Sequence, residues 1–176
     1  RLALAAATAA VFAAGSALAQ APIVIKFSHV VAPDTPKGKG AEKFKELAEA
    51  KLKGKVKVEV YPNSQLYKDG EEMEALSLGS VQMLAPSLAK FGPLGVRELE
   101  VFDLPFMFDS YAELHKVTGG PAGAALLKKL EPKGIVGLAY WDNGFKVLSS
   151  NKQMKLPADA KGQKMRIQSS KVLEAQ

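Results

Sequence analysis

Arginine is the scarcest cation in this sequence: only three of its 24 basic residues are arginines. Arg166 lies between two apolar residues, Met165 and Ile167, and small hydroxyl residues follow it at Ser169 and Ser170. A guanidinium presents a planar fork that matches a carboxylate with two parallel hydrogen bonds, which a lysine ammonium cannot do. Arg166 is therefore a candidate carboxylate anchor. The alternative is an arginine that covers the edge of a sheet.

Lys37 is a second candidate for anion binding. It falls at the start of a predicted helix, where a cation opposes the helix dipole and a bound anion would offset that effect. Residues 37–40 only superficially resemble a phosphate loop, because the third glycine of G-x-G-x-x-G is absent. The eight lysines of residues 37–57 alternate with glutamates, which is typical of a solvated helix rather than of a nucleic-acid surface. The sequence thus predicts no nucleic-acid partner.

Several kinds of chemistry are excluded or unsupported by composition. There is no cysteine, which excludes a thiolate nucleophile, a Cys-ligated zinc and a disulfide. His29 and His115 are far apart without metal-ligand spacing. No G-x-S-x-G elbow or P-loop occurs, and the carboxylates are spread along solvated faces. The sequence therefore predicts neither an enzyme nor a metal or other cofactor. The 176 residues, 47% hydrophobic and 24% charged, have the balance of a soluble globular protein.

The predicted elements alternate between strands and helices. Apolar alternation and apolar runs predict strands at 23–29, 55–61, 81–85, 135–141, 146–149 and 164–168. Helical spacing and caps predict helices at 36–52, 69–79 (opened by an Asp69–Glu72 capping box), 110–117, 121–130 and 171–176. This order predicts an α/β fold with a mainly parallel sheet and helices on both faces.

Ligands of such sheets bind beyond the carboxyl ends of the strands. The segments that follow the predicted strands are 29–37, 86–87, 141–146 and 166–169. They add four ligand candidates to Arg166 and Lys37: His29, Ser87, Asn143 and Lys146.

The two ends of the sequence carry further signals. After Arg1, residues 2–19 are uncharged and end on Ala-Leu-Ala, which is the pattern of a secretory signal peptide. The alternative is an uncleaved membrane helix. Residues 169–176 read as the first turns of an uncapped helix, so we expect the sequence to be a fragment.

Four stretches, in this order, match one known family: Ile25–His29 with Asp34–Gly38, then Asp103–Phe108, then Trp141–Phe145, then Leu156–Arg166. Together with the signal peptide they resemble a TRAP transporter solute-binding protein of the C4-dicarboxylate-binding (DctP-type) family. The resemblance covers residues 23–176.

This resemblance implies a two-lobed periplasmic clamshell of the type II kind. Residues 1–19 would be the signal peptide, 20–142 most of the first lobe, and 143–176 the hinge and the start of a second lobe whose remainder is missing. The ligand, a small carboxylate, would lie between the lobes and pass to a membrane permease driven by an ion gradient. The receptor itself would not span the membrane after signal removal.

The resemblance also implies roles for single residues. In the family, the arginine at the Arg166 position pairs with the substrate carboxylate. Many relatives carry a second arginine where this sequence has Lys146, and Lys37 is a position shared by many dicarboxylate binders. Two alternatives stay open: a secreted α/β enzyme acting on organic acids, and a binding protein that feeds a sensor kinase.

Overall fold

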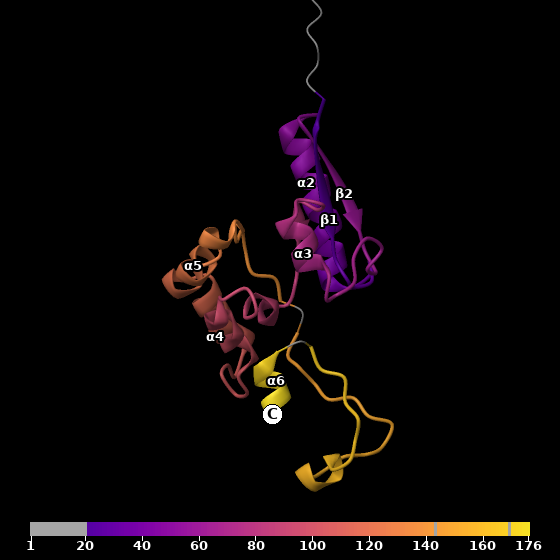
Figure 1. The fold of residues 1–176 in the computed structure, drawn as a ribbon, viewed down its shortest axis with the longest axis vertical. Helices are drawn as coiled ribbons and strands as arrows, with labels where there is room; N and C mark the ends of the chain where they lie inside the picture. The colour runs from indigo at the N-terminus through magenta and orange to yellow at the C-terminus, as the bar shows by residue number, and fades with distance from the viewer. Residues whose placement is uncertain (1–20, 143, 169) are drawn as a thin grey trace, which may run out of the picture.

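The computed structural model describes residues 21–142, 144–168 and 170–176 (Figure 1). The predicted signal peptide at 1–19 lies outside these residues. The strands are β1 (Ile23–Ser28), β2 (Val56–Tyr61) and β3 (Met83–Leu84). The α-helices are α2 (Pro36–Leu52), α3 (Glu72–Ser77), α4 (Tyr111–Thr118), α5 (Pro121–Lys128) and α6 (Lys171–Ala175). Short 3-10 helices are η1 (Leu88–Phe91), η2 (Arg97–Asp103), η3 (Glu131–Lys133) and η4 (Pro157–Ala160). None of the helices described here has both the length and the apolar character needed to cross a membrane.

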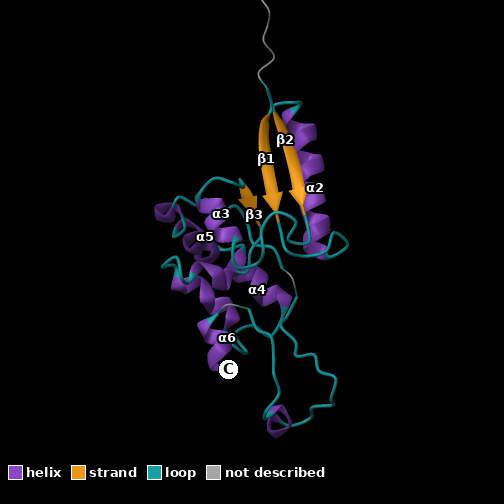
Figure 2. Ribbon diagram, turned by 45° about the vertical axis from the view of Figure 1, so that its right-hand side comes forward, coloured by secondary structure: helices purple, strands orange, loops and turns teal. Residues whose placement is uncertain are grey.

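The strands of the described part form a parallel sheet in the order β2-β1-β3 (Figure 2). β1 pairs with β2 from Ile23–Val56 through Ser28–Tyr61, and with β3 at Phe27–Met83. The parallel sheet expected from the sequence is thus confirmed. The chain passes from β1 to β2 on one side and then returns to place β3 on the other side of β1. The strand order therefore reverses at β1, and ligands of parallel sheets bind at the carboxyl ends of the strands beside such a switch point.

Helix α2 connects β1 to β2, and its ends have local causes. The Thr35 hydroxyl accepts a hydrogen bond from the Gly38 amide at 3.1 Å, and Pro36 occupies the first helical position. The helix ends at Leu52, and its C-cap residue, Lys53, adopts a left-handed conformation with φ 42°. The helix therefore begins and ends where the sequence predicts it.

Two apolar cores hold the described residues together. The first joins α2 to the sheet through Phe27, Val58 and Ala41, with Phe44 packed edge-on against Phe27. The second lies between α3, the 3-10 helices and α5, and consists of Met73, Phe91, Val96, Leu99, Leu130 and Ile135. The first core positions the carboxyl end of β1, and the second positions the segment that follows β3.

Three of the predicted strands are wrong. Residues 135–141, 146–149 and 164–168 have no strand assigned in the structure, although each is rich in apolar residues. A strand is stabilised mainly by its cross-strand neighbours, and within the described residues these segments have no ladder partner. Residues 144–168 instead run away from the remaining structure and return to α6 (Figure 1).

Two local predictions also need correction. The Asp69–Glu72 capping box does not form, because α3 begins at Glu72 and its N-cap residue, Glu71, makes no side-chain cap bond. The Glu72 carboxylate turns inward to Lys90 instead. Residues 99–108, for which the sequence predicted neither helix nor strand, contain part of the 3-10 helix η2.

Candidate carboxylate-binding site

A buried lysine lies at the centre of the charged groups near the sheet. The Lys90 side chain is 7% exposed, and its ammonium contacts the Glu72 carboxylate at 2.5 Å. It also donates to the backbone carbonyl of Asp69 at 2.5 Å and to the carboxylate of the same residue. Burial raises the pKa of Glu72, and the hydrogen bond from Lys90 opposes that shift. The buried ammonium of Lys90 thus has three hydrogen-bond acceptors, which compensate for the loss of water around its charge.

Arg166 joins this cluster through Asp69. One terminal guanidinium nitrogen, Nη2, lies 3.6 Å from the Asp69 carboxylate, while 74% of the Arg166 side chain is exposed. The distance exceeds ordinary hydrogen-bond length, so the contact is a loose ion pair. Most of the guanidinium edge remains open to solvent and able to receive a second carboxylate.

Lys37 approaches the same cluster from the first turn of α2. Its ammonium donates to the carbonyl of Ala85, just beyond β3, at 2.9 Å. Burial lowers the pKa of Lys37, the nearby Glu72 carboxylate opposes that shift, and Lys90 adds to it. Lys37 therefore connects the start of α2 to the segment after β3, at the carboxyl edge where a ligand of a parallel sheet is expected.

His29 follows β1 directly and is held by its backbone. Its amide donates to the Tyr61 carbonyl at 3.0 Å, and its carbonyl accepts from the Ser64 amide at 3.2 Å. The side chain is buried and lies edge-on to Phe27, and neither ring nitrogen has a hydrogen-bond partner among the residues described. Burial lowers the pKa of His29, an effect that the backbone of Val31 opposes. The ring is thus favoured in its neutral form.

Ser87 lies just after β3, and its hydroxyl donates to the side-chain oxygen of Gln168 at 3.4 Å. This contact connects the segment beyond β3 with the segment that carries Arg166. The structure thereby brings the predicted ligand segment 86–87 next to residues 166–168, the described part of the predicted segment 166–169.

Lys146 occupies a different position. Its ammonium pairs with the carboxylate of Asp103, whose side chain is almost fully buried at the end of η2. The backbone carbonyl of Asp103 also accepts a hydrogen bond from Gln176 at 3.0 Å. Lys146 and Arg166 are therefore paired with different carboxylates. The sixth predicted residue, Asn143, lies outside the described residues.

Sequence reasoning missed the acidic and basic residues that organise this site: Asp69, Glu72, Lys90 and Asp103. One signal was available for Lys90, which stands alone between apolar neighbours at Ala89 and Phe91. The Asp69–Glu72 pair was assigned to helix capping, and the buried partner that changes its role is distant in the sequence.

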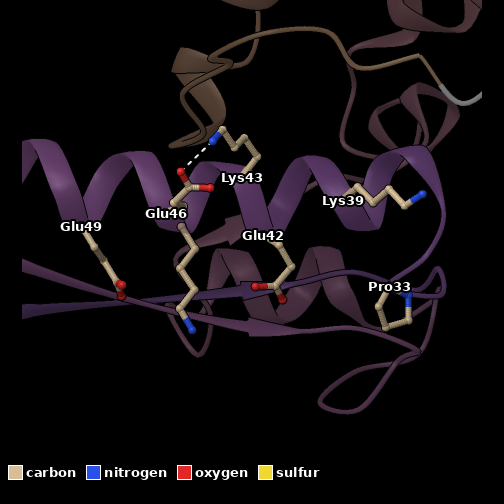
Figure 3. Close-up of a pocket in the computed structure, with 7 residues that line it drawn as sticks. Pro33, Lys39, Glu42, Lys43, Glu46 and Glu49 are labelled. Atoms are coloured by element: carbon tan, nitrogen blue, oxygen red, sulfur yellow. Dashed lines mark hydrogen bonds and ion pairs between the residues drawn. The ribbon is translucent and has the colours of Figure 1, made fainter.

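The outer face of α2 carries an open depression that is separate from these groups (Figure 3). A surface ion pair joins Lys43 to Glu46 across it at 2.6 Å. Its lining residues are Pro33, Lys39, Glu42, Lys43, Lys45, Glu46 and Glu49. None of the five predicted ligand residues that the structure describes lines it, so we assign it no role in ligand binding.

Cations outnumber carboxylates among the described residues of this cluster. Lys37, Lys90 and Arg166 face the two carboxylates of Asp69 and Glu72, which leaves one net positive charge when all are ionised. Within the described residues no group of three or more His, Asp or Glu side chains could hold a metal ion.

Residues 27–176 match the family described as "Bacterial extracellular solute-binding protein, family 7". The chain belongs to this family. The resemblance drawn from the four sequence stretches is therefore confirmed. This family consists of solute-binding receptors and is not an enzyme family.

Two relatives of this chain are named as dicarboxylate-binding proteins. The C4-dicarboxylate-binding periplasmic protein DctP of Rhodobacter capsulatus is 73% identical over 155 residues, which are 88% of this chain and 46% of the relative. The protein of the same name from Shewanella loihica is 49% identical over 156 residues, 89% of this chain and 46% of the relative. The chain thus spans about half the length of the curated relatives it matches. The predicted periplasmic location agrees with the family and with these names.

Solved structures support the same assignment. A TRAP periplasmic solute-binding protein from Pseudomonas aeruginosa, with bound L-malate, has a TM-score of 0.83 and 56% identity, covering 88% of this chain and 53% of that one. A second, from Sulfurospirillum deleyianum with bound succinate, has a TM-score of 0.83 and 54% identity, covering 89% of this chain and 50% of that one. The predicted α/β class, in the form found in TRAP solute-binding proteins, is confirmed.

Proposed function

We propose that the full-length protein is a periplasmic receptor that captures a small dicarboxylate and delivers it to a TRAP-type membrane permease. The observation that carries this proposal is the position of Arg166, which lies with an open guanidinium edge beside the Lys37–Lys90 cluster at the carboxyl end of the sheet. The ligand class comes from relatives, since the two solved structures above hold L-malate and succinate.

The charges provide a physical basis for this ligand class. Removing a carboxylate from water costs several kcal/mol unless the site pairs it with a cation and hydrogen bonds. A charge-assisted hydrogen bond contributes about 1.5–3 kcal/mol, so a bidentate contact with Arg166 offsets much of that cost. In our proposal Lys37 meets the second carboxylate, and Ser87, Asn143, His29 and Lys146 complete the contacts.

The division into lobes is part of the same proposal. Residues 20–142 contain both apolar cores described above and would form most of the first lobe. Residues 143–176 would form the hinge and begin a second lobe that corresponds to the part of the relatives that this chain does not span. Closure of the lobes would be driven by the higher affinity of the closed form for the ligand.

Isothermal titration of the full-length mature protein with succinate and L-malate tests the role of Arg166. We expect Arg166→Ala to weaken binding about tenfold or more, because one lost charge-assisted bond corresponds to roughly that factor. Arg97→Ala, which removes an exposed arginine in η2, is the matched control and should leave affinity unchanged. Unchanged affinity of Arg166→Ala would remove this residue from the site.

Lys146→Ala is expected to have a smaller effect than Arg166→Ala, since a lysine lacks the bidentate geometry. A loss equal to that of Arg166→Ala would give the two residues equal weight.

Incubation of the protein with each acid, followed by proton NMR of the acid, separates receptor from enzyme. Reversible binding without turnover supports the receptor, and a new product would support the enzymatic alternative.

A further inference from the structure

Asp69 lies between a buried cation and an exposed one. We propose that its carboxylate is an internal competitor that sets the affinity of the site, because it pairs with Arg166 in the ligand-free protein and is replaced there by the ligand carboxylate. This inference rests on the proposed function, and it assigns to Asp69 a role opposite in sign to that of Arg166.

The two oxygens of Asp69 have unequal surroundings. Oδ1 contacts the Lys90 ammonium, which is 7% exposed and also bound to Glu72 and to the Asp69 backbone carbonyl. Among the described residues, Oδ2 pairs only with the largely exposed Arg166, at 3.6 Å. One side of the carboxylate is therefore firmly held, while the other makes a loose contact that is easily exchanged.

Because of this asymmetry, a ligand carboxylate can replace Asp69 as the partner of Arg166 while the Asp69 side chain stays in place. When a ligand carboxylate takes the guanidinium of Arg166, the half-buried Asp69 keeps Lys90 as a partner and is not left unpaired. The exchange still has an unfavourable part, since the Arg166–Asp69 attraction is lost and the two carboxylates repel each other. Removal of the Asp69 charge abolishes both contributions, so the affinity for an anion should increase.

The test is titration of the full-length mature protein with succinate, using wild type, Asp69→Asn and Glu74→Gln. Asn keeps the shape of the side chain and removes its charge. Glu74 is an exposed residue of α3, so Glu74→Gln makes the same change in net charge without touching the cluster. Since exposed ion pairs have small energies, we expect Asp69→Asn to bind succinate about two- to fivefold tighter, and Glu74→Gln to bind like wild type.

The direction of the effect separates this role from a purely structural one, because damage to the fold would weaken binding. If wild type binds succinate but Asp69→Asn binds no more tightly than Glu74→Gln, Asp69 is not a competitor and the receptor function stands. If wild type binds neither succinate nor L-malate, the proposed function fails, and the inference fails with it.

A second variant and a second measurement cover the case in which Asp69→Asn does not fold, as judged by circular dichroism. Asp69→Ser removes the same charge with a smaller side chain and should also tighten binding. In the wild-type protein, NMR signals of the Arg166 Nε–H group and of the Asp69 carboxylate carbon should both move when succinate is added. A shift at Arg166 without one at Asp69 would overturn the exchange.

Discussion

Residues 21–130 and residues 144–168 both contain apolar patterns typical of strands, but only the first region buries them. Phe27 in β1 is 1% exposed and is paired in register with strands on both sides. Val147 in the second region is 85% exposed, and no ladder forms there among the residues described. The apolar character of the two segments is similar, and what differs is the presence of neighbours.

The same contrast holds for charge. In the first region Lys90 is buried with two carboxylates and a carbonyl around it, whereas the cations of 144–168 are exposed. The Arg166–Asp69 and Lys146–Asp103 pairs join the two regions. The second region thus contributes ligand candidates and takes little part in the cores that position them.

The largest expected effect is that of removing an aromatic ring from the first core. Phe27→Ala should lower the free energy of unfolding by about 3–5 kcal/mol, because it leaves a cavity against Phe44 and Trp141. Val147→Ala should change it little in this chain. Urea denaturation followed by circular dichroism measures both, and equal losses would contradict the difference drawn between the regions.

A somewhat smaller loss is expected from Lys90→Met. The substitution roughly keeps the volume of the side chain but leaves Asp69 and Glu72 without their buried cation. The free energy of unfolding should therefore fall by about 3 kcal/mol. Uptake of a proton by Glu72, whose pKa burial raises, keeps the loss at this level. Lys164→Met, in the exposed second region, is the control. If the two variants unfold at the same urea concentration, Lys90 is not a structural cation.

The smallest effect concerns His29 and pH. Since the pKa of the folded His29 is lowered from the usual 6.5, the unfolded chain takes up the proton first, and stability falls as the pH drops below that value. Replacing His29 with Gln should make melting temperature less dependent on pH between pH 7 and 5. Ser28→Ala, which changes a neighbouring buried hydroxyl without removing a titrating group, should keep the wild-type slope. An unchanged slope in His29→Gln would show that His29 is not the titrating group.

Prediction from sequence was most accurate where the deciding contacts are local. The ends of α2 follow from Thr35, Pro36 and the turn after Leu52, all within a few residues. The helices α4 and α5 were likewise expected close to their observed positions. Prediction failed for the strands at 135–141, 146–149 and 164–168, because a strand depends on a partner that local sequence does not reveal.

In the candidate site, likewise, some features were predicted from the sequence and others were not. Arg166 and Lys37 were identified from residue type and position, since a planar guanidinium and a cation at a helix start have recognisable chemistry. The contacts of these two residues were not predicted, because the Asp69–Glu72 pair is far in sequence from Lys37, Lys90 and Arg166. The ligand candidates were expected at the carboxyl edge of the sheet because parallel strands such as β1 and β3 end at the same edge. The alternation of strands and helices in the sequence does indicate such a parallel sheet.

The sequence by itself determined the α/β class and the family, and it supplied candidate residues for carboxylate binding, because side-chain chemistry and helix ends are local properties. The tertiary structure alone decided that Lys90 is buried between Asp69 and Glu72, that Asp69 faces Arg166, and that Lys146 pairs with Asp103. These pairings depend on which distant segments the sheet and the two cores bring together, and the energy of a charge depends on what surrounds it once water has been removed.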